Sequence, residues 1–275
     1  MRKASDKPIR LRSKFLSQYG IVLALVLIII VFSFSTENFF SPSNAINVLR
    51  QVSIKGIVSI GMCFVILTGG IDLSVGSIMA LSGIVVASMV KTGANLYLCI
   101  LCGCLVGLAC GVVNGFFVAY RGMPAFVVTM AVQLACRGLS YIISDAKPIS
   151  NLPDSFLTIG KGDFLGIPIP VWILIAVFLA SWFIMERTVA GRHLYAVGGN
   201  KHTALVSGIN VKTIEFGAYI MCGILCGLAA TIMTARVSSA LSNAASGYES
   251  DAIAAAVIGG FSLAGGKGKL WGTIV

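Results

Sequence analysis

Long uncharged apolar runs recur along this chain of 275 residues, and they constrain its fold more than any other feature. Hydrophobic residues make up 57% of the sequence and charged residues only 11%, whereas a soluble domain typically carries about 25% charged residues. A bilayer core needs roughly 20 apolar residues per helix, so these runs can be laid out as spans joined by short connections. The sequence therefore predicts an all-α, polytopic transmembrane helical bundle.

Hydropathy and chain-breaking residues predict about eight spans and the start of another. The predicted spans are residues 20–36, 52–68, 75–90, 95–119, 125–143, 171–185, 213–235 and 251–263. A further apolar segment begins at Trp271 and is not completed by Val275, so we expect the sequence to be C-terminally incomplete. Residues 20–275 then form one transmembrane domain.

Positive charge is concentrated at the N-terminus. Six of the twenty Lys and Arg residues lie in the first fourteen positions, directly ahead of the apolar run from Gly20 to Phe34. The positive-inside rule predicts a cytoplasmic basic tail over residues 1–19, and membrane orientation accounts for the net charge of +10 without a nucleic-acid partner. No small-residue cleavage site follows in residues 35–40, which favours a retained first helix over a cleaved signal peptide.

Two long loops carry opposite charge patterns. With the N-terminus inside, counting the spans places loop 144–170 outside and loop 186–212 inside. The predicted inside loop contains Arg187, Arg192, Lys201 and Lys212, in agreement with the positive-inside rule. The predicted outside loop contains four prolines, which argue against a long helix there.

Metal and catalytic chemistry find little support in the sequence. All eight cysteines lie in apolar segments, where free cysteine behaves as a small hydrophobic residue. The only two histidines, His193 and His202, have no carboxylate pair beside them. We therefore expect no metal site and no catalytic centre.

The segment from Leu67 to Ser77 places Asp72 among apolar residues. Charge at membrane depth is costly, so such a residue generally faces protein or a water-filled cavity. Gly69 and Gly70 loosen the helix, and Ser74 can satisfy freed backbone groups. This pattern indicates a broken segment at a pore, although an interfacial loop in which Asp72 caps the next helix fits the same residues.

A faint internal repeat involves the same glycines. Gly69-Gly70 is followed after five residues by Gly76, and Gly265-Gly266 is followed after five residues by Gly272, an offset of 196 in both cases. Both copies lie between an inward and an outward span, so the repeat is parallel. Matching glycine breaks in two halves point to a translocation pathway, but chance pairing is an alternative in a chain with 31 glycines.

The predicted inside loop contains a capping signature. Asn200 is a favourable N-cap and Gly208 a favourable residue after a helix end, which predicts a two-turn helix over residues 201–207. So short a helix is marginal alone and needs a docking partner. Ala204 and Leu205 are its central apolar residues, and a plain amphipathic connector is the alternative interpretation.

An ordered set of motifs spans most of the chain. The motifs are Gly69 to Ser77 (GGIDLSVGS), Asn114-Gly115, Met123 to Thr129, Arg137-Gly138, Gly247-Tyr248-Glu249, Asp251 to Ala255, and Gly259-Gly260. From about residue 20 to residue 275 this set resembles the permease family of ribose-type monosaccharide ABC importers, a binding-protein-dependent transport inner membrane component family. The resemblance implies a permease subunit that translocates ribose or a similar simple sugar across the bacterial plasma (inner) membrane.

The resemblance also implies partners. They are a second permease copy, a periplasmic or lipid-anchored sugar-binding protein, membrane lipid, and a separate ATPase subunit that uses ATP and Mg, while this chain binds no cofactor. Loop 186–212 matches the coupling loop that such permeases insert into the ATPase. The expected pathway residues are Gly69, Gly70, Asp72, Ser74, Asn114, Phe126, Thr129 and Arg137. The expected coupling residues are Gly191, Arg192, Asn200, Ala204, Leu205, Ser207 and Gly208.

Two other functions compete with this interpretation. An ion-coupled secondary transporter of a small polar solute usually shows several intramembrane carboxylates, whereas Asp72 is the only strong candidate away from predicted span ends. An intramembrane enzyme needs a convergent catalytic set, and the sequence shows none. Gly265 to Lys269 is glycine- and lysine-rich but lacks the spacing of a phosphate-binding loop. Arg137 either lines the pathway or extends toward an interface.

Overall fold

A computed structural model of the chain describes residues 26–35 and 39–274. The chain divides into two units, residues 1–48 and 49–275. In the first unit, residues 26–35 are helical and the first turns of α2 begin at Pro42. The predicted basic tail over residues 1–19 and the start of the first predicted span lie outside the described residues.

Among the described residues, five helices are long and apolar enough to cross a membrane. They are α2 (Pro42–Leu67), α4 (Leu96–Gly115) continued by the π-helix η1 (Phe116–Tyr120), α5 (Ala125–Ile143), α7 (Ile169–Arg187) and α10 (Val211–Val237). A further apolar helix, α3 (Val75–Lys91), has 17 residues. The prediction of an all-α bundle with membrane-spanning helices is confirmed.

Most predicted spans coincide with these helices, but two boundaries differ. The helix predicted to start at residue 52 starts ten residues earlier, at Pro42, because Arg50 and Lys55 lower the hydropathy of its first half without interrupting the helix. The span predicted over 251–263 is instead α11 (Tyr248–Ile258), which has 11 residues and ends before Gly259. At 1.5 Å per residue, α11 is roughly half as long as a bilayer core is thick.

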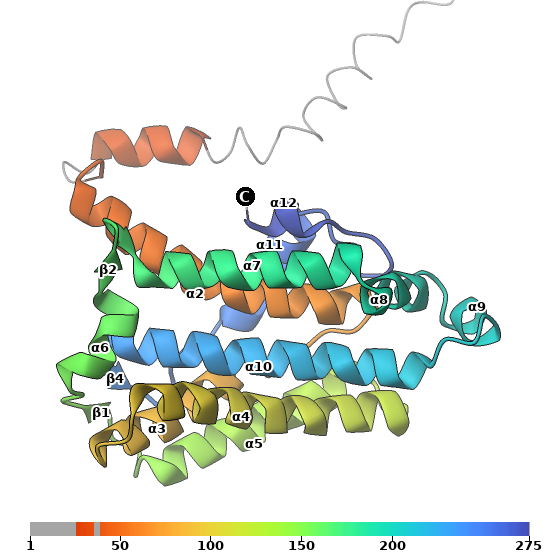
Figure 1. Cartoon of the computed structure of the whole chain (residues 1–275), viewed down its shortest axis with the longest axis horizontal. Helices are drawn as coiled ribbons and strands as arrows, with labels where there is room; N and C mark the ends of the chain where they lie inside the picture. The colour runs from red at the N-terminus through yellow and green to blue at the C-terminus, as the bar shows by residue number, and fades with distance from the viewer. Residues whose placement is uncertain (1–25, 36–38, 275) are drawn as a thin grey trace, which may run out of the picture. The chain divides into compact units, whose positions relative to one another are not determined.

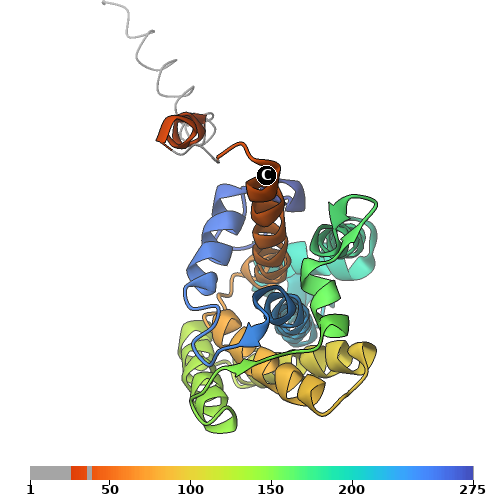
Figure 2. The same ribbon diagram turned by 90° about the vertical axis from the view of Figure 1, so that its left-hand side faces the viewer.

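In the second unit, α10 lies at the centre, with α2 and α7 on one side and α3, α4 and α5 on the other (Figures 1 and 2). Its closest neighbour is α4, and glycines allow their two backbones to touch. A methyl group placed on Gly107 would overlap the carbonyl oxygen of Gly223, and one on Gly227 would overlap that of Gly103. Small residues four positions apart are typical of such close helix packing in membranes.

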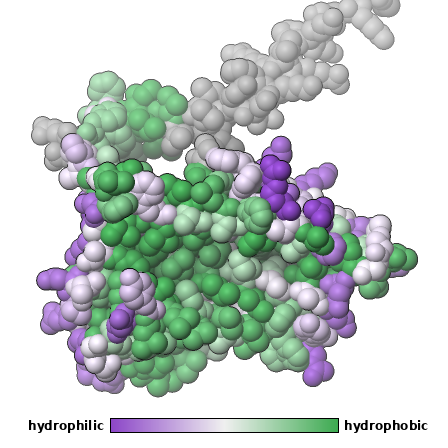
Figure 3. Space-filling view, viewed as in Figure 1, coloured by the Kyte–Doolittle hydropathy of each residue, from purple (hydrophilic) through white to green (hydrophobic). Residues whose placement is uncertain are grey.

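Polar connections gather at the two ends of this bundle, and an apolar surface lies between them on the face seen in Figure 3. At one end are β1 (Ile149–Ser150), α6 (Asp154–Lys161), the hairpin β2 (Asp163–Phe164) and β3 (Ile167–Pro168), and β4 (Ser239–Ala240), which pairs with β1. At the other end are α8 (Val189–Gly199) and α9 (Lys201–Val206) (Figure 1). The last helix of the described residues is α12 (Leu270–Ile274).

The predicted short helix of loop 186–212 is confirmed as α9. The Asn200 side chain accepts a hydrogen bond from the Thr203 backbone amide at 2.9 Å, and Gly208 follows the helix in the left-handed conformation, with φ of 80°. Helix α8 was not predicted. Its N-cap Thr188 accepts a hydrogen bond from the Gly191 backbone amide at 3.2 Å. Three of its eleven residues are glycines, which lower helix propensity and argue against a helix when the sequence is considered alone.

Candidate functional site

The Asp72 carboxylate lies in a fully buried polar cluster where α2 gives way to α3. One of its oxygens accepts from the backbone amide of Ser74 at 2.8 Å and from the Ser74 hydroxyl at 2.5 Å. The Asn114 amide of α4 donates to Ser74 Oγ at 2.8 Å and to the other Asp72 oxygen at 3.3 Å. The hydrogen bonds of this cluster therefore connect the turn before α3 to the C-terminal end of α4.

Tyr219 of α10 lies next to this turn. Its side chain is buried, and its hydroxyl has no hydrogen-bond partner within the described residues. A methyl group on Gly70 would lie 2.6 Å from that hydroxyl oxygen. Gly70 is therefore the residue that allows the turn to pass close to α10.

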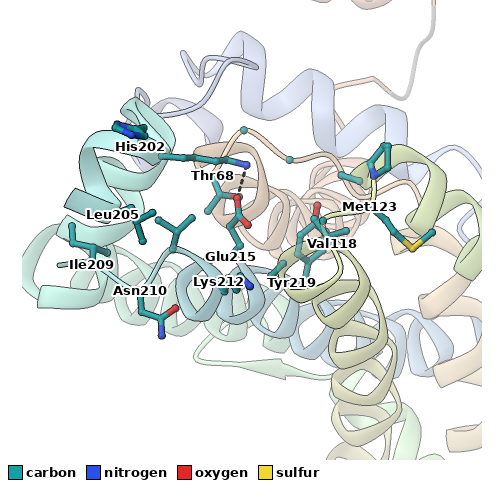
Figure 4. Close-up of a pocket in the computed structure, with 18 of the residues that line it drawn as sticks. Thr68, Val118, Met123, His202, Leu205, Ile209, Asn210, Lys212, Glu215 and Tyr219 are labelled. Atoms are coloured by element: carbon teal, nitrogen blue, oxygen red, sulfur yellow. Dashed lines mark ion pairs between the residues drawn. The ribbon is translucent and has the colours of Figure 1, made fainter. Parts of the chain in front are cut away.

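A cavity of about 830 Å³ opens beside the cluster (Figure 4). It is bounded by the turn at residues 68–70, by residues 118–125 from η1 to the start of α5, and by residues 201–219 of α9 and α10. Glu215 and Tyr219, one helical turn apart on α10, form part of its wall. The cavity has the size expected of a small-molecule site.

An ion pair crosses this cavity from α9 to α10. Lys201 Nζ lies 2.5 Å from Glu215 Oε1, and the Glu215 side chain is largely buried while that of Lys201 is exposed (Figure 4). Because Lys201 directly follows the α9 N-cap, the pair links α9 to the helix that carries Tyr219. Glu215 was not among the predicted site residues because it lies near the start of a predicted span, where charge is unremarkable.

The loop predicted to couple to an ATPase is built on tight backbone contacts. A methyl group on Gly191 would overlap the carbonyl oxygens of Ile184 and Met185, so the α7–α8 turn requires glycine there. Arg192 is exposed on α8, and the Ser207 hydroxyl donates to the Thr203 carbonyl at 2.9 Å.

Ala204 and Leu205, both expected as coupling residues, differ in exposure. Ala204 is only 3% exposed, because α9 turns this residue toward the rest of the chain. Leu205 is 63% exposed and remains available for docking, together with Val206 at 75%. Sequence spacing identified the helix but did not fix which of its apolar residues faces inward.

The structure does not bring all predicted pathway residues together. Gly70, Asp72, Ser74 and Asn114 gather at the buried cluster, and Gly69 begins the same turn with φ of 80°. The remaining three are Phe126, Thr129 and Arg137. Phe126 is 58% exposed on the surface of α5, and Thr129 is buried with its hydroxyl donating to the Ala125 carbonyl.

Arg137 has a structural contact that neither sequence interpretation included. Its Nη1 donates to the carbonyl oxygens of Ser242 and Ala244 at 2.8 and 2.9 Å. These carbonyls belong to the irregular segment between β4 and α11. Because this segment is not helical, its carbonyl oxygens need other hydrogen-bond donors. Arg137 thus holds this segment against α5.

Comparison with known proteins identifies the family. The model of the family described as "Branched-chain amino acid transport system / permease component" matches residues 44–275. The chain is 42% identical over 266 residues to the ribose import permease protein RbsC of Haemophilus influenzae, covering 95% of this chain and 82% of that protein. It is 44% identical over 264 residues to RbsC of Escherichia coli, covering 94% and 82%.

A third relative is named for a sugar other than ribose. The D-allose transport system permease protein AlsC of Escherichia coli is 38% identical over 275 residues, covering 99% of this chain and 84% of that protein. No solved structure matches the chain significantly.

The prediction of a permease subunit rather than an enzyme is confirmed by the similarities to these permeases. The apolar helices, the family match and the relatives together show that the chain belongs to this permease family and is a multi-pass membrane transport component.

Proposed function

We propose that this permease imports ribose or a similar monosaccharide as the membrane subunit of an ABC importer. The observation that carries the proposal is the identity of 38 to 44% with permeases named for ribose and allose, over at least 94% of this chain. More distant relatives are named for L-arabinose and xylose, which are also simple sugars. The neutral donors around Asp72 and the cavity beside them suit a polyhydroxylated, uncharged solute.

Uptake of radiolabelled D-ribose tests this function. Cells that express the chain with its partner subunits are expected to accumulate ribose, with competition by excess unlabelled allose, arabinose or xylose. Leucine serves as the contrasting solute, because the family description names branched-chain amino acids. If the cells accumulate leucine but not ribose, the proposed import of a monosaccharide is wrong.

The same assay separates an ABC importer from an ion-coupled carrier. We infer that a separate ATPase supplies the energy with ATP and Mg, since this chain offers no nucleotide-binding motif. Ribose uptake is then expected to persist when a protonophore collapses the proton gradient, provided that cellular ATP is maintained. Loss of uptake at constant ATP would favour the secondary transporter.

Energy coupling is proposed to enter through α8 and α9. We expect Leu205→Asp with Val206→Asp to reduce co-purification of the ATPase and sugar-stimulated ATP hydrolysis at least tenfold, because two charges would replace the exposed apolar residues of α9. The control is Leu165→Asp, an equally drastic change at a position 78% exposed in the β2–β3 turn. Full ATPase binding by the α9 variant would exclude α9 as the docking element.

We further propose that the chain lies in the bacterial inner membrane with a cytoplasmic N-terminus. Loop 186–212 is then inside and loop 144–170 outside. Single cysteines at Ser155 of α6 and Thr203 of α9, both exposed, test this orientation in a background without the native cysteines. An impermeant thiol reagent is expected to label position 155 on intact cells and position 203 only after permeabilisation, and the opposite pattern would reverse the topology.

A parallel pseudo-repeat is part of the proposal, and so are about eight apolar membrane segments, of which α11 is too short to cross a bilayer alone. Gly69 and Gly265 both have positive φ, at 80° and 84°, and each precedes a helix that begins five or six residues later. Lys55 and Asp251 form an ion pair and are also separated by 196 residues. These features support a duplicated unit, and a second copy of the chain together with a sugar-binding protein would complete the importer.

A further inference from the structure

A partly exposed ion pair connects α2 to α11. Lys55 Nζ of α2 is 2.7 Å from Asp251 Oδ2 of α11, and the two side chains are 36% and 49% exposed. The same Nζ lies 5.4 Å from the centre of the Tyr248 ring. Two opposite charges and an aromatic face therefore form a small, partly open cluster.

Lys55 lies within α2, one of the helices long and apolar enough to cross a membrane. Lys55 is close to the midpoint of the 26-residue helix α2, roughly 18 Å from its C-terminal end at 1.5 Å per residue. Charges within a membrane span generally face a water-filled cavity or other protein, because exposure to lipid is strongly unfavourable. Water or protein is therefore expected on the exposed side of the pair.

The segment before α11 is irregular. The backbone between β4 and α11 runs along α3, where Ala244 and Ala245 share a small pocket with Met79 and Gly83. A methyl group on Gly76, at the start of α3, would overlap the carbonyl oxygen of Ala245. Non-helical backbone at membrane depth is tolerated where protein or a water-filled cavity surrounds it, and such breaks occur at the substrate sites of transporters.

We infer that Lys55, Tyr248 and Asp251 form a contact site for the transported solute inside the membrane, an inference that rests on the proposed sugar import. Lys55 donates and Asp251 accepts hydrogen bonds, so together they match the paired donor and acceptor character of neighbouring sugar hydroxyls. The Tyr248 ring offers an apolar face to the C–H groups of a sugar. The carboxylate and ammonium neutralise one another, which suits passage of a neutral, polyhydroxylated solute.

Cysteine accessibility tests whether this site faces water. Ala254 is exposed on α11 one turn after Asp251, and Leu134 is 70% exposed at the middle of α5. In the assembled importer without native cysteines, Ala254→Cys is expected to react with a charged methanethiosulfonate reagent and to be protected at least threefold by ribose. The control Leu134→Cys is expected to react only with a lipid-soluble maleimide.

Two results at position 254 would overturn the inference. Reaction with the lipid-soluble reagent alone would place the cluster against lipid, and reaction with neither reagent would place it in a closed contact between copies of the chain. Labelling by the charged reagent does not depend on which solute is carried. A chain that imports no ribose but shows this labelling therefore contradicts the proposed function and not the position of the site.

Transport by charge variants tests the chemistry of the site. Lys55→Gln and Asp251→Asn are each expected to reduce ribose uptake at least tenfold, with a raised KM, while ATPase co-purification stays at the wild-type level. The exchange of both charges, Lys55→Asp with Asp251→Lys, keeps an ion pair but reverses the donor and the acceptor. A purely structural pair would regain full uptake in the exchanged chain, and that result would refute a solute contact, as would normal uptake by both neutral variants.

Discussion

A Gly107→Leu chain is expected to fail to pack α4 against α10 and to be recovered aggregated or degraded. Even a methyl group on Gly107 would overlap the backbone carbonyl of Gly223, and backbone cannot rotate away as a side chain can. Overpacking of a well-packed core typically costs about 1–3 kcal/mol, and a leucine forced between two backbones is expected to reach or exceed the upper value. The measurement is the yield of monodisperse protein and its thermal midpoint in detergent.

Gly138→Leu is the matched control for this substitution. Gly138 lies within α5, and no atom lies within 4 Å of a methyl group built on it. The same change is therefore expected to leave yield and thermal midpoint close to those of the wild type. Equal recovery of the Gly107 and Gly138 variants would show that the α4–α10 contact is looser than the structure indicates.

Gly70→Ala is expected to reduce uptake more than tenfold while the subunits still assemble. The added methyl group would lie 2.6 Å from the Tyr219 hydroxyl oxygen and 3.2 Å from Val65 Cγ1, so the turn before α3 must shift. That shift would disturb the hydrogen bonds that Asp72 accepts from Ser74. Uptake rates and ATPase co-purification, measured on the same preparation, separate a transport defect from an assembly defect.

A second substitution makes this prediction specific. The Tyr219 hydroxyl is buried without a partner among the described residues, so Tyr219→Phe alone is expected to change stability by less than about 1 kcal/mol. In the double variant, the nearest remaining ring atom of residue 219 lies 3.4 Å from the new methyl group, an ordinary contact. Uptake is therefore expected to recover in Gly70→Ala with Tyr219→Phe, and a double variant as defective as the single one would refute the contact.

Hydropathy located most of the membrane-span helices closely. The helix predicted over residues 125–143 matches α5, and others agree within two residues. Hydropathy failed at the start of α2, where a different signal was present: the Asn44 amide donates to the Ser41 hydroxyl, and Pro42 occupies the first helical position. The capping residues therefore mark the start of α2 better than hydropathy does.

The candidate site was predictable only in part, because its residues converge from distant segments. Gly70 and Asp72 stood out because of their unusual neighbours in sequence. Tyr219 and Lys55 did not, since a tyrosine in a span and a lysine near a predicted span end are common. Their importance arises from contacts across 149 residues of sequence between Gly70 and Tyr219, and 196 between Lys55 and Asp251.

The packing of α8 has a mechanical consequence. A methyl group on Gly198 would overlap both the Leu67 carbonyl oxygen and the Gly266 amide nitrogen, and the Gly266 amide donates to the Leu67 carbonyl at 2.9 Å. Gly198 of α8 therefore contacts both the end of α2 and the turn before α12. If α8 moves, we expect both turns to move with it, so a displacement of α8 would reach two segments that lie far apart in the sequence.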